Sequence, residues 1–142
     1  MSPNQIFPIV NAVAAGCWLM LAVLPHRRWV PDVVAGVAVP AMLAGIYTII
    51  IGLNFWGAEG GFSSLAGVAL LFSNPWLLLA GWIHYLAFDL LVGSWEARDA
   101  RKRGIAHVVL LPCLILTFLF GPAGWLLYLA ARSIPVKGRS AV

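Results

Sequence analysis

Long apolar runs separated by short polar stretches make up most of this chain of 142 residues. Four of the runs are long enough to cross a bilayer as helices, because about 20 apolar residues cover a hydrocarbon core of about 30 Å. The four predicted spans cover about residues 5–24, 31–53, 75–95 and 105–130. The pattern therefore predicts an all-α integral membrane protein whose single domain, residues 1–142, is a four-helix bundle.

A glycine-rich stretch joins the second and third runs and contains a shorter apolar segment, residues 64–72. This segment is too short to cross hydrocarbon as a helix, so we expect an interfacial or re-entrant helix that could cover a cavity between the spans. Asn74 and Pro75 follow it, and this pair favours the start of a helix, because asparagine is a common N-cap and proline a common first helical residue.

The composition supports the membrane class. Hydrophobic residues make up 62% of the chain and charged residues only 10%, whereas a soluble domain carries about 25% charged residues. The basic residues form three clusters, at residues 27–28, 98–103 and 132–139, next to the ends of predicted spans. Such clusters are typical of anchors on lipid headgroups. Membrane lipid is therefore an expected partner, and nucleic acid is not.

The distribution of lysine and arginine predicts the orientation of the chain. The loops after the first and third runs carry six of the nine basic residues, the C-terminal tail carries three, and the loop between the second and third runs carries none. Because cytoplasmic loops are enriched in lysine and arginine, we expect both basic loops in the cytoplasm and both termini outside. The six are Arg27, Arg28, Arg98, Arg101, Lys102 and Arg103, and the three are Arg132, Lys137 and Arg139.

The third run contains two ionisable residues at positions where hydrocarbon is expected. By the helical rise, His84 lies about 13 Å and Asp89 about 21 Å from the outer boundary. An aspartate at the centre of a spanning helix costs about 2.5–3.5 kcal/mol on insertion scales, so such residues usually face the bundle interior and mark a functional site. The alternative is an interhelical hydrogen bond that only fixes the packing.

Helical spacing sorts the polar residues of this run into faces. Trp82, Tyr85, Asp89 and Glu96 follow one stripe, because residues three, four or seven apart share a face of a helix. His84 lies about 140° around the helix from Asp89. The two side chains cannot point along one line, but both can border a wide cavity.

Other runs supply polar residues at similar depth. Asn11 in the first run and Tyr47 in the second are each about 9 Å inside the outer boundary, so they could converge with His84. The alternatives are an aromatic-belt role for Tyr47 and helix–helix contact for Asn11. The candidate substrate-binding residues are Asn11, Tyr47, Trp82, Trp18 and Phe88.

A second polar set lies at the cytoplasmic rim and raises the question of a metal. Histidine and carboxylate ligands suit iron or zinc, but the set shows no local ligand spacing, and rim residues often pair with nearby arginines. We therefore expect neither a metal nor a cofactor. The set is His26, Asp32, Glu96, Asp99 and His107, of which His26, Glu96, Asp99 and His107 are the weak metal candidates.

Gly121 and Pro122 interrupt the fourth run. Proline removes a backbone donor and tends to kink a helix, and the freed carbonyl groups need a partner from protein or water. We expect a kink here, which either opens an entrance from the lipid or serves packing alone.

Two stretches carry a family resemblance: "LFSNPWLLLAGWIHYLAFDLLVGSWEARDA" and "HVVLLPCLILTFLFGPAGWLLYL". They resemble the membrane family that includes the plant abscisic-acid-deficiency-four protein, which is linked to neoxanthin synthesis, and the resemblance covers about residues 4–132. It implies a four-helix membrane protein that acts on carotenoids, where the plant reaction opens an epoxide to form an allene. Without a plastid transit segment, the chain is expected to be a bacterial member in the inner membrane.

The residues of the third run suit the chemistry that the resemblance implies. An epoxide-to-allene isomerisation needs a base to remove a vinylic proton and an acid to protonate the epoxide oxygen, and it consumes no redox cofactor. Asp89 is the candidate base, with His84 or Tyr85 as the acid. These three are the candidate catalytic residues of a cofactor-independent carotenoid isomerase.

Two alternatives remain. A non-catalytic protein could bind a carotenoid or other isoprenoid and present it to a partner enzyme, with the polar residues orienting a ring hydroxyl. A small proton-coupled carrier could instead use Asp89, although four helices are few for a carrier without a homo-oligomer. For the isomerase and for the non-catalytic binder, the expected partner is a lipophilic small molecule. The oligomeric state stays open.

Overall fold

The computed structural model of the protein describes residues 1–133. This part of the chain is all-α, as predicted. Its elements are α1 (Pro3–Val23), the π-helix η1 (Val30–Ala38), α2 (Val39–Asn54), α3 (Leu65–Phe72), α4 (Pro75–Arg103), α5 (His107–Phe120) and α6 (Pro122–Ser133).

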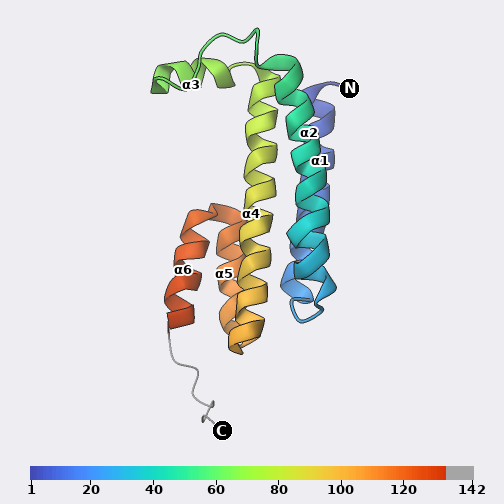
Figure 1. Ribbon diagram of the computed structural model, residues 1–142, viewed down its shortest axis with the longest axis vertical. Coiled ribbons are helices and arrows are strands. Elements are labelled where there is room, and N and C mark those ends of the chain that lie inside the picture. Colours follow the sequence, from blue (N-terminus) through green and yellow to red (C-terminus); the bar gives the residue numbers. More distant parts are fainter. Residues whose placement is uncertain (134–142) are drawn as a thin grey trace.

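Three long apolar helices form the body of the molecule: α1, the continuous pair η1–α2, and α4 (Figure 1). They contain 21, 25 and 29 residues, so each is at least about 30 Å long and can cross a bilayer. Helix α4 is central, because it packs against every other helix of the described chain. The first three predicted spans are therefore confirmed as long apolar helices.

Helix α4 begins where the sequence predicts. The Asn74 side chain accepts a hydrogen bond from the backbone N–H of Trp76 at 2.9 Å, and Pro75 is the first helical residue. The helix ends at Gly104, whose φ of +70° is favourable for glycine. It thus runs about two turns beyond the predicted end at residue 95, because its polar last turns are held by ion pairs that hydropathy does not reveal.

The second long helix begins as a π-helix, which is a rare conformation. Arg98 of α4 reaches this segment and donates a hydrogen bond from Nη1 to the carbonyl oxygen of Pro31 at 2.7 Å. Gly36 makes room for it, because a Cβ there would lie 2.5 Å from Arg98 Nη1 and from the Pro31 oxygen. The start of the helix is therefore anchored to α4.

The predicted fourth span is not a single helix. It divides at Gly121 (φ +28°), and Pro122 begins a new helix, so that α5 and α6 pack side by side as a hairpin (Figure 1). Gly124 allows the close packing, because a Cβ there would collide with the backbone and hydroxyl of Thr117. The predicted kink is therefore a reversal, and the predicted four-helix bundle is not confirmed.

The hairpin determines where the last described residues lie. Helix α1 begins at one end of the molecule, and α6 runs back toward the opposite end (Figure 1). The expectation that both termini lie outside depended on a fourth span, and the orientation of the chain in a membrane stays a prediction.

The short helix predicted between the second and third spans is present as α3. Ser64 caps it, accepting a hydrogen bond from the backbone N–H of Gly67 at 3.0 Å. The helix lies across the end of α4 (Figure 1). It therefore overhangs the edge of the molecule above the α5–α6 hairpin.

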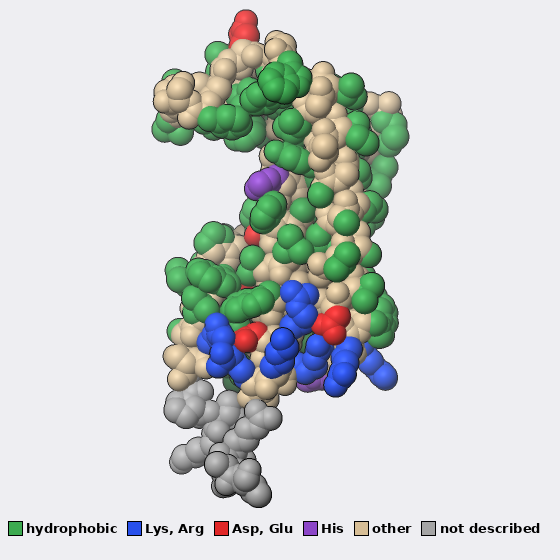
Figure 2. Space-filling model, in the orientation of Figure 1, with side chains coloured by type: hydrophobic (Ala, Val, Ile, Leu, Met, Phe, Trp, Pro, Cys, Tyr) green, Lys and Arg blue, Asp and Glu red, His purple; other side chains and the backbone are tan. Residues whose placement is uncertain are grey.

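The basic side chains gather at the opposite end, over the loops that join α1 to η1 and α4 to α5 (Figure 2). Arg132 of α6 lies toward this end as well. Lys137 and Arg139 lie outside the described residues. The described chain therefore has one strongly basic end, and Glu59 is the one charged side chain described at the other.

Candidate functional site

The candidate residues of α4 divide between two faces of the helix. Tyr85, Asp89 and Glu96 face the α5–α6 hairpin, whereas His84 faces α2 and α3. His84 and Asp89 therefore lie on different faces of α4, as expected, and each contacts different neighbouring helices.

Asp89 lies at the tip of the hairpin. Its side chain is close to Gly121, because a Cβ on that glycine would come within 2.7 Å of Asp89 Oδ1. Asp89 is only 8% exposed, and its Oδ2 is buried without a hydrogen-bond partner in the described chain. Since Asp89 is the middle residue of α4, the hairpin tip reaches the middle of that helix and places an incompletely paired carboxylate there.

Tyr85 fixes the hairpin tip beside this carboxylate. Its hydroxyl lies 3.3 Å from the carbonyl oxygens of both Phe118 and Leu119 and donates to them. These carbonyls belong to the last turn of α5, where the helix itself offers no donor. Tyr85 therefore caps α5 and, one turn before Asp89 on the same face, brings a second ionisable group to the tip.

Glu96 lies two turns nearer the basic end and is fully buried. Its Oε1 accepts a hydrogen bond from the Thr117 hydroxyl at 2.9 Å, and its Oε2 has no partner in the described chain. The sequence did not single out Thr117, and it marked Gly121 only as a break in the fourth run, although both touch the predicted acidic stripe. Neither a single threonine in an apolar run nor an expected kink indicates which residues of α4 these two positions meet.

The indole of Trp82 joins α4 to α1. Its Nε1 donates a hydrogen bond to Asn11 Oδ1 at 3.0 Å, and its ring lies 5.8 Å from that of Phe7 and 5.3 Å from that of Tyr85. Asn11 therefore pairs with Trp82 rather than converging with Tyr47 and His84. The three aromatic rings form a row that leads toward the hairpin tip.

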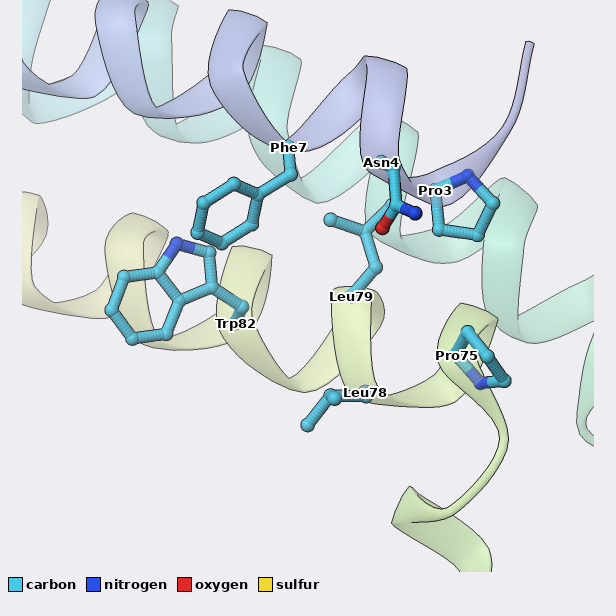
Figure 3. A pocket seen from close by; sticks show the side chains of 7 residues that line it. All are labelled: Pro3, Asn4, Phe7, Pro75, Leu78, Leu79 and Trp82. Carbon is cyan, nitrogen blue, oxygen red and sulfur yellow. The ribbon is translucent and has the colours of Figure 1, made fainter.

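This row begins at a pocket of about 260 Å³ between the starts of α1 and α4. Figure 3 shows Phe7 and Trp82 facing each other at one end of the pocket and Pro3 and Pro75 at the other. Trp18, the remaining aromatic candidate of α1, packs against Phe118 of the hairpin, with ring centroids 5.5 Å apart and ring planes tilted by 55°. It lines an entirely apolar groove of about 250 Å³ between α1 and α5.

His84 lies in a different setting. Its ring is 4.5 Å from that of Phe88, nearly parallel at 20°, and 5.7 Å from that of Tyr47. These three candidates therefore lie together. No hydrogen bond joins the imidazole to the described part of the chain. The histidine lines a cavity of about 360 Å³ with Tyr47, Ile51, Phe55, Phe62, Leu71, Phe72, Leu77 and Gly81.

The polar residues of the basic end lie in separate contacts. His26 and His107 meet edge to face at 5.6 Å. Asp32 pairs with Arg101 at 2.9 Å, while Asp99 is surrounded by Arg103, Arg132 and Tyr128. Within residues 1–133, no three histidine, cysteine or acidic side chains gather in a way that could hold a metal ion. The weak metal candidates thus do not converge.

The family model described as ABA DEFICIENT 4-like matches residues 5–128, which include the three long helices and the hairpin tip. The chain belongs to the ABA4-like family. Searches of curated proteins and of solved structures found no match. The resemblance seen in the sequence is therefore confirmed.

Two polar positions on α4 thus characterise this ABA4-like chain. One is the pair of the half-buried Tyr85 and the buried Asp89 at the hairpin tip, which offers a hydroxyl and a carboxylate on one face of α4. The other is His84 on the wall of the cavity beneath α3. The first has the groups needed for proton transfer, and the second has the shape of a binding pocket.

Proposed function

We propose that the protein binds a carotenoid within the membrane and isomerises it by acid–base chemistry at the hairpin tip. The observation that carries the proposal is the buried Asp89, which keeps one carboxylate oxygen without a partner beside the Tyr85 hydroxyl in the middle of α4. Membership of the ABA4-like family supports a carotenoid as the ligand. Intramembrane ionisable residues usually mark functional sites.

In this proposal Asp89 is the base and Tyr85 the acid. The Asp89 carboxylate takes the proton from the vinylic carbon next to the epoxide, the electron pair of that C–H bond forms the second double bond of the allene, and the epoxide C–O bond on the neighbouring carbon breaks. The oxygen takes a proton from the Tyr85 hydroxyl, and Asp89 returns its proton to Tyr85. The product is an isomer, so the step needs no oxidant or reductant. Tyr85 fits the acid role better than His84, because only Tyr85 shares the hairpin face with Asp89.

We infer that α1, η1–α2 and α4 cross a bacterial inner membrane and that α5–α6 enters from the basic side and returns to it. The basic loops then lie in the cytoplasm, by the positive-inside rule, with the N-terminus outside. Arg132 joins the basic loops in this arrangement instead of opposing them. The hairpin therefore makes the charge asymmetry of the described chain stronger than a fourth span would.

A second candidate function is a non-catalytic carotenoid-binding protein. The observation that favours it is that the hydroxyl groups of Tyr85 and Thr117 both form hydrogen bonds that join α4 to the hairpin. Tyr85 caps α5 and Thr117 binds Glu96, so these contacts hold the helices together even without chemistry. Binding would then use the apolar pockets alone.

Expression in a host that makes epoxy-carotenoids tests both functions. We expect the wild-type protein to change the pigment profile, and Asp89→Asn and Tyr85→Phe to lower conversion by at least about 100-fold, the size typical of a lost acid or base. Glu59→Gln, a matched loss of an exposed carboxylate, should leave conversion unchanged. Full conversion by Asp89→Asn would overturn the catalytic role, and coloured protein with unaltered pigment would favour the binder.

A further inference from the structure

The half-length hairpin leaves part of α4 uncovered. Its tip meets α4 at Asp89, so the earlier half of α4 has no hairpin beside it. Figure 2 shows the result: the molecule is hollowed along this edge, with α3 overhanging the hollow, the hairpin beneath it and a histidine side chain on its wall. Such a hollow opens sideways, toward the acyl chains of the bilayer.

The hollow contains the cavity of about 360 Å³ lined by His84. Three phenylalanines of its lining, Phe55, Phe62 and Phe72, give it an aromatic wall, and the polar side chains are those of Tyr47 and His84. Gly81 forms part of the wall because a Cβ there would lie 3.0 Å from the Phe72 ring. The volume is within the range of about 300–1,000 Å³ for small-molecule pockets.

The imidazole of His84 is oriented but not hydrogen-bonded. Stacking on Phe88 and contact with Tyr47 hold its plane, while no described residue bonds to its nitrogen atoms. A polar group in hydrocarbon without a partner is costly. Because neutral imidazole has one donor and one acceptor nitrogen, a ligand hydroxyl could satisfy it.

We propose that this hollow binds one end of an elongated apolar ligand from the bilayer, with a terminal hydroxyl on His84 and the remainder extending into the acyl chains. The choice of a carotenoid as probe rests on the proposed function; the site itself does not. It differs from the Asp89–Tyr85 position by facing α2 and α3. Because the basic residues lie at the far end, the ligand enters from the leaflet opposite them.

Binding of two matched pigments to the protein in lipid nanodiscs tests this site. Zeaxanthin and β-carotene share the same polyene and differ in the two ring hydroxyls. We expect zeaxanthin to bind with induced circular dichroism, and β-carotene to bind roughly tenfold more weakly, as for the loss of one hydrogen bond. His84→Leu should lower zeaxanthin affinity to that of β-carotene and leave β-carotene unchanged.

Three further variants test the location. Gly81→Leu fills the cavity against Phe72 and should weaken both pigments, whereas Gly45→Leu, which meets open space on α2, should weaken neither. Ile51→Trp narrows the same cavity from α2 and replaces Gly81→Leu if that protein does not elute as a single species. Unchanged binding in the cavity-filling variants would overturn the location.

The result separates this inference from the proposed function, since binding is measured without turnover. Equal affinity for both pigments, or an unaffected His84→Leu, would overturn hydroxyl recognition by His84. Absence of pigment binding, with lipid alone in the hollow, would overturn the site. Histidine-dependent binding by a protein that converts no carotenoid would support the site while the proposed enzyme fails.

Discussion

The two halves of α4 use their polar residues in opposite ways. Toward the basic end every long polar side chain that faces a neighbouring helix has a partner: Arg98 binds the Pro31 carbonyl, Arg101 binds Asp32, and Asp99 accepts from Tyr128 at 2.7 Å. In the middle and toward the other end, Asp89 Oδ2 and the His84 imidazole have no partner in the described chain.

This difference indicates which polar groups hold the structure and which are available to a ligand. A buried polar group without a partner lowers the free energy of unfolding. A function of that group can explain why the protein retains it despite the lost stability. Paired groups near the basic end tie α4 to η1 and to α6. Asp89 faces the hairpin tip and His84 faces the hollow, whereas the unbonded Glu96 Oε2 and Arg101 Nη1 belong to side chains whose other polar atoms are paired.

The largest expected effect on stability comes from Gly124, where the hairpin helices touch. Gly124→Ala places a methyl group on the backbone and hydroxyl of Thr117. We expect a loss of about 3 kcal/mol, the upper part of the usual range for overpacking. The measurement is the thermal unfolding midpoint of the purified protein in detergent.

A matched substitution gives this prediction its control. Gly52→Ala, in α2, meets nothing within 4 Å, and alanine in a helix is favoured over glycine by about 1 kcal/mol. The two variants should therefore shift the midpoint in opposite directions. Equal shifts would show that α5 and α6 do not pack as closely as described.

The next effect concerns Asp99, the shared partner of three side chains. Asp99→Ala leaves Arg103, Arg132 and Tyr128 without their acceptor, at a carboxylate that is only 16% exposed. We expect a loss of about 3 kcal/mol, as for breaking a largely buried charge pair. Differential scanning fluorimetry in detergent measures it.

Asp32→Ala is the comparison for Asp99. Its side chain is 37% exposed and pairs with Arg101, and exposed ion pairs contribute about 0–1 kcal/mol. If Asp32→Ala lowers the free energy of unfolding as much as Asp99→Ala does, the polar contacts of α4 with η1 and with α6 contribute equally to stability.

The sequence predicted the long helices well because their apolar runs alone determine them. It also placed Tyr85, Asp89 and Glu96 on one face, since helical spacing fixes which residues share a stripe. It did not predict the hairpin. Residues 105–130 read as one apolar run, and Gly121–Pro122 indicated a break without giving its angle. That angle depends on packing between α5 and α6, which no local pattern encodes.

The partner of Asn11 shows a second limit. Depth along the membrane follows from residue number, so Asn11, Tyr47 and His84 could be placed at similar levels. The rotation of each helix about its axis does not follow from depth, and in the structure Asn11 faces Trp82 instead. Rotation is set by the neighbours of a helix, and these are known only once the fold is known.

A smaller effect is expected at Thr117, which partners the buried Glu96. Thr117→Val keeps the shape of the side chain but leaves Glu96 Oε1, like Oε2, without a hydrogen bond. We expect a loss of about 2 kcal/mol in unfolding free energy, the cost of an unsatisfied buried group. Glu96→Gln keeps an acceptor for Thr117 and should change stability by less than about 1 kcal/mol. If both variants match the wild type, this contact does not hold the hairpin.

The smallest effect is expected at His84, and it sharpens the contrast between the two halves of α4. Because the imidazole is exposed and has no hydrogen bond within the described chain, His84→Leu should not lower ligand-free stability. Added zeaxanthin should then raise the unfolding midpoint of the wild type, by an amount that grows with the logarithm of ligand concentration over Kd, and should raise that of the variant much less. If the ligand-free variant is as unstable as Asp99→Ala, His84 is a structural residue, and the halves of α4 do not differ in the way described.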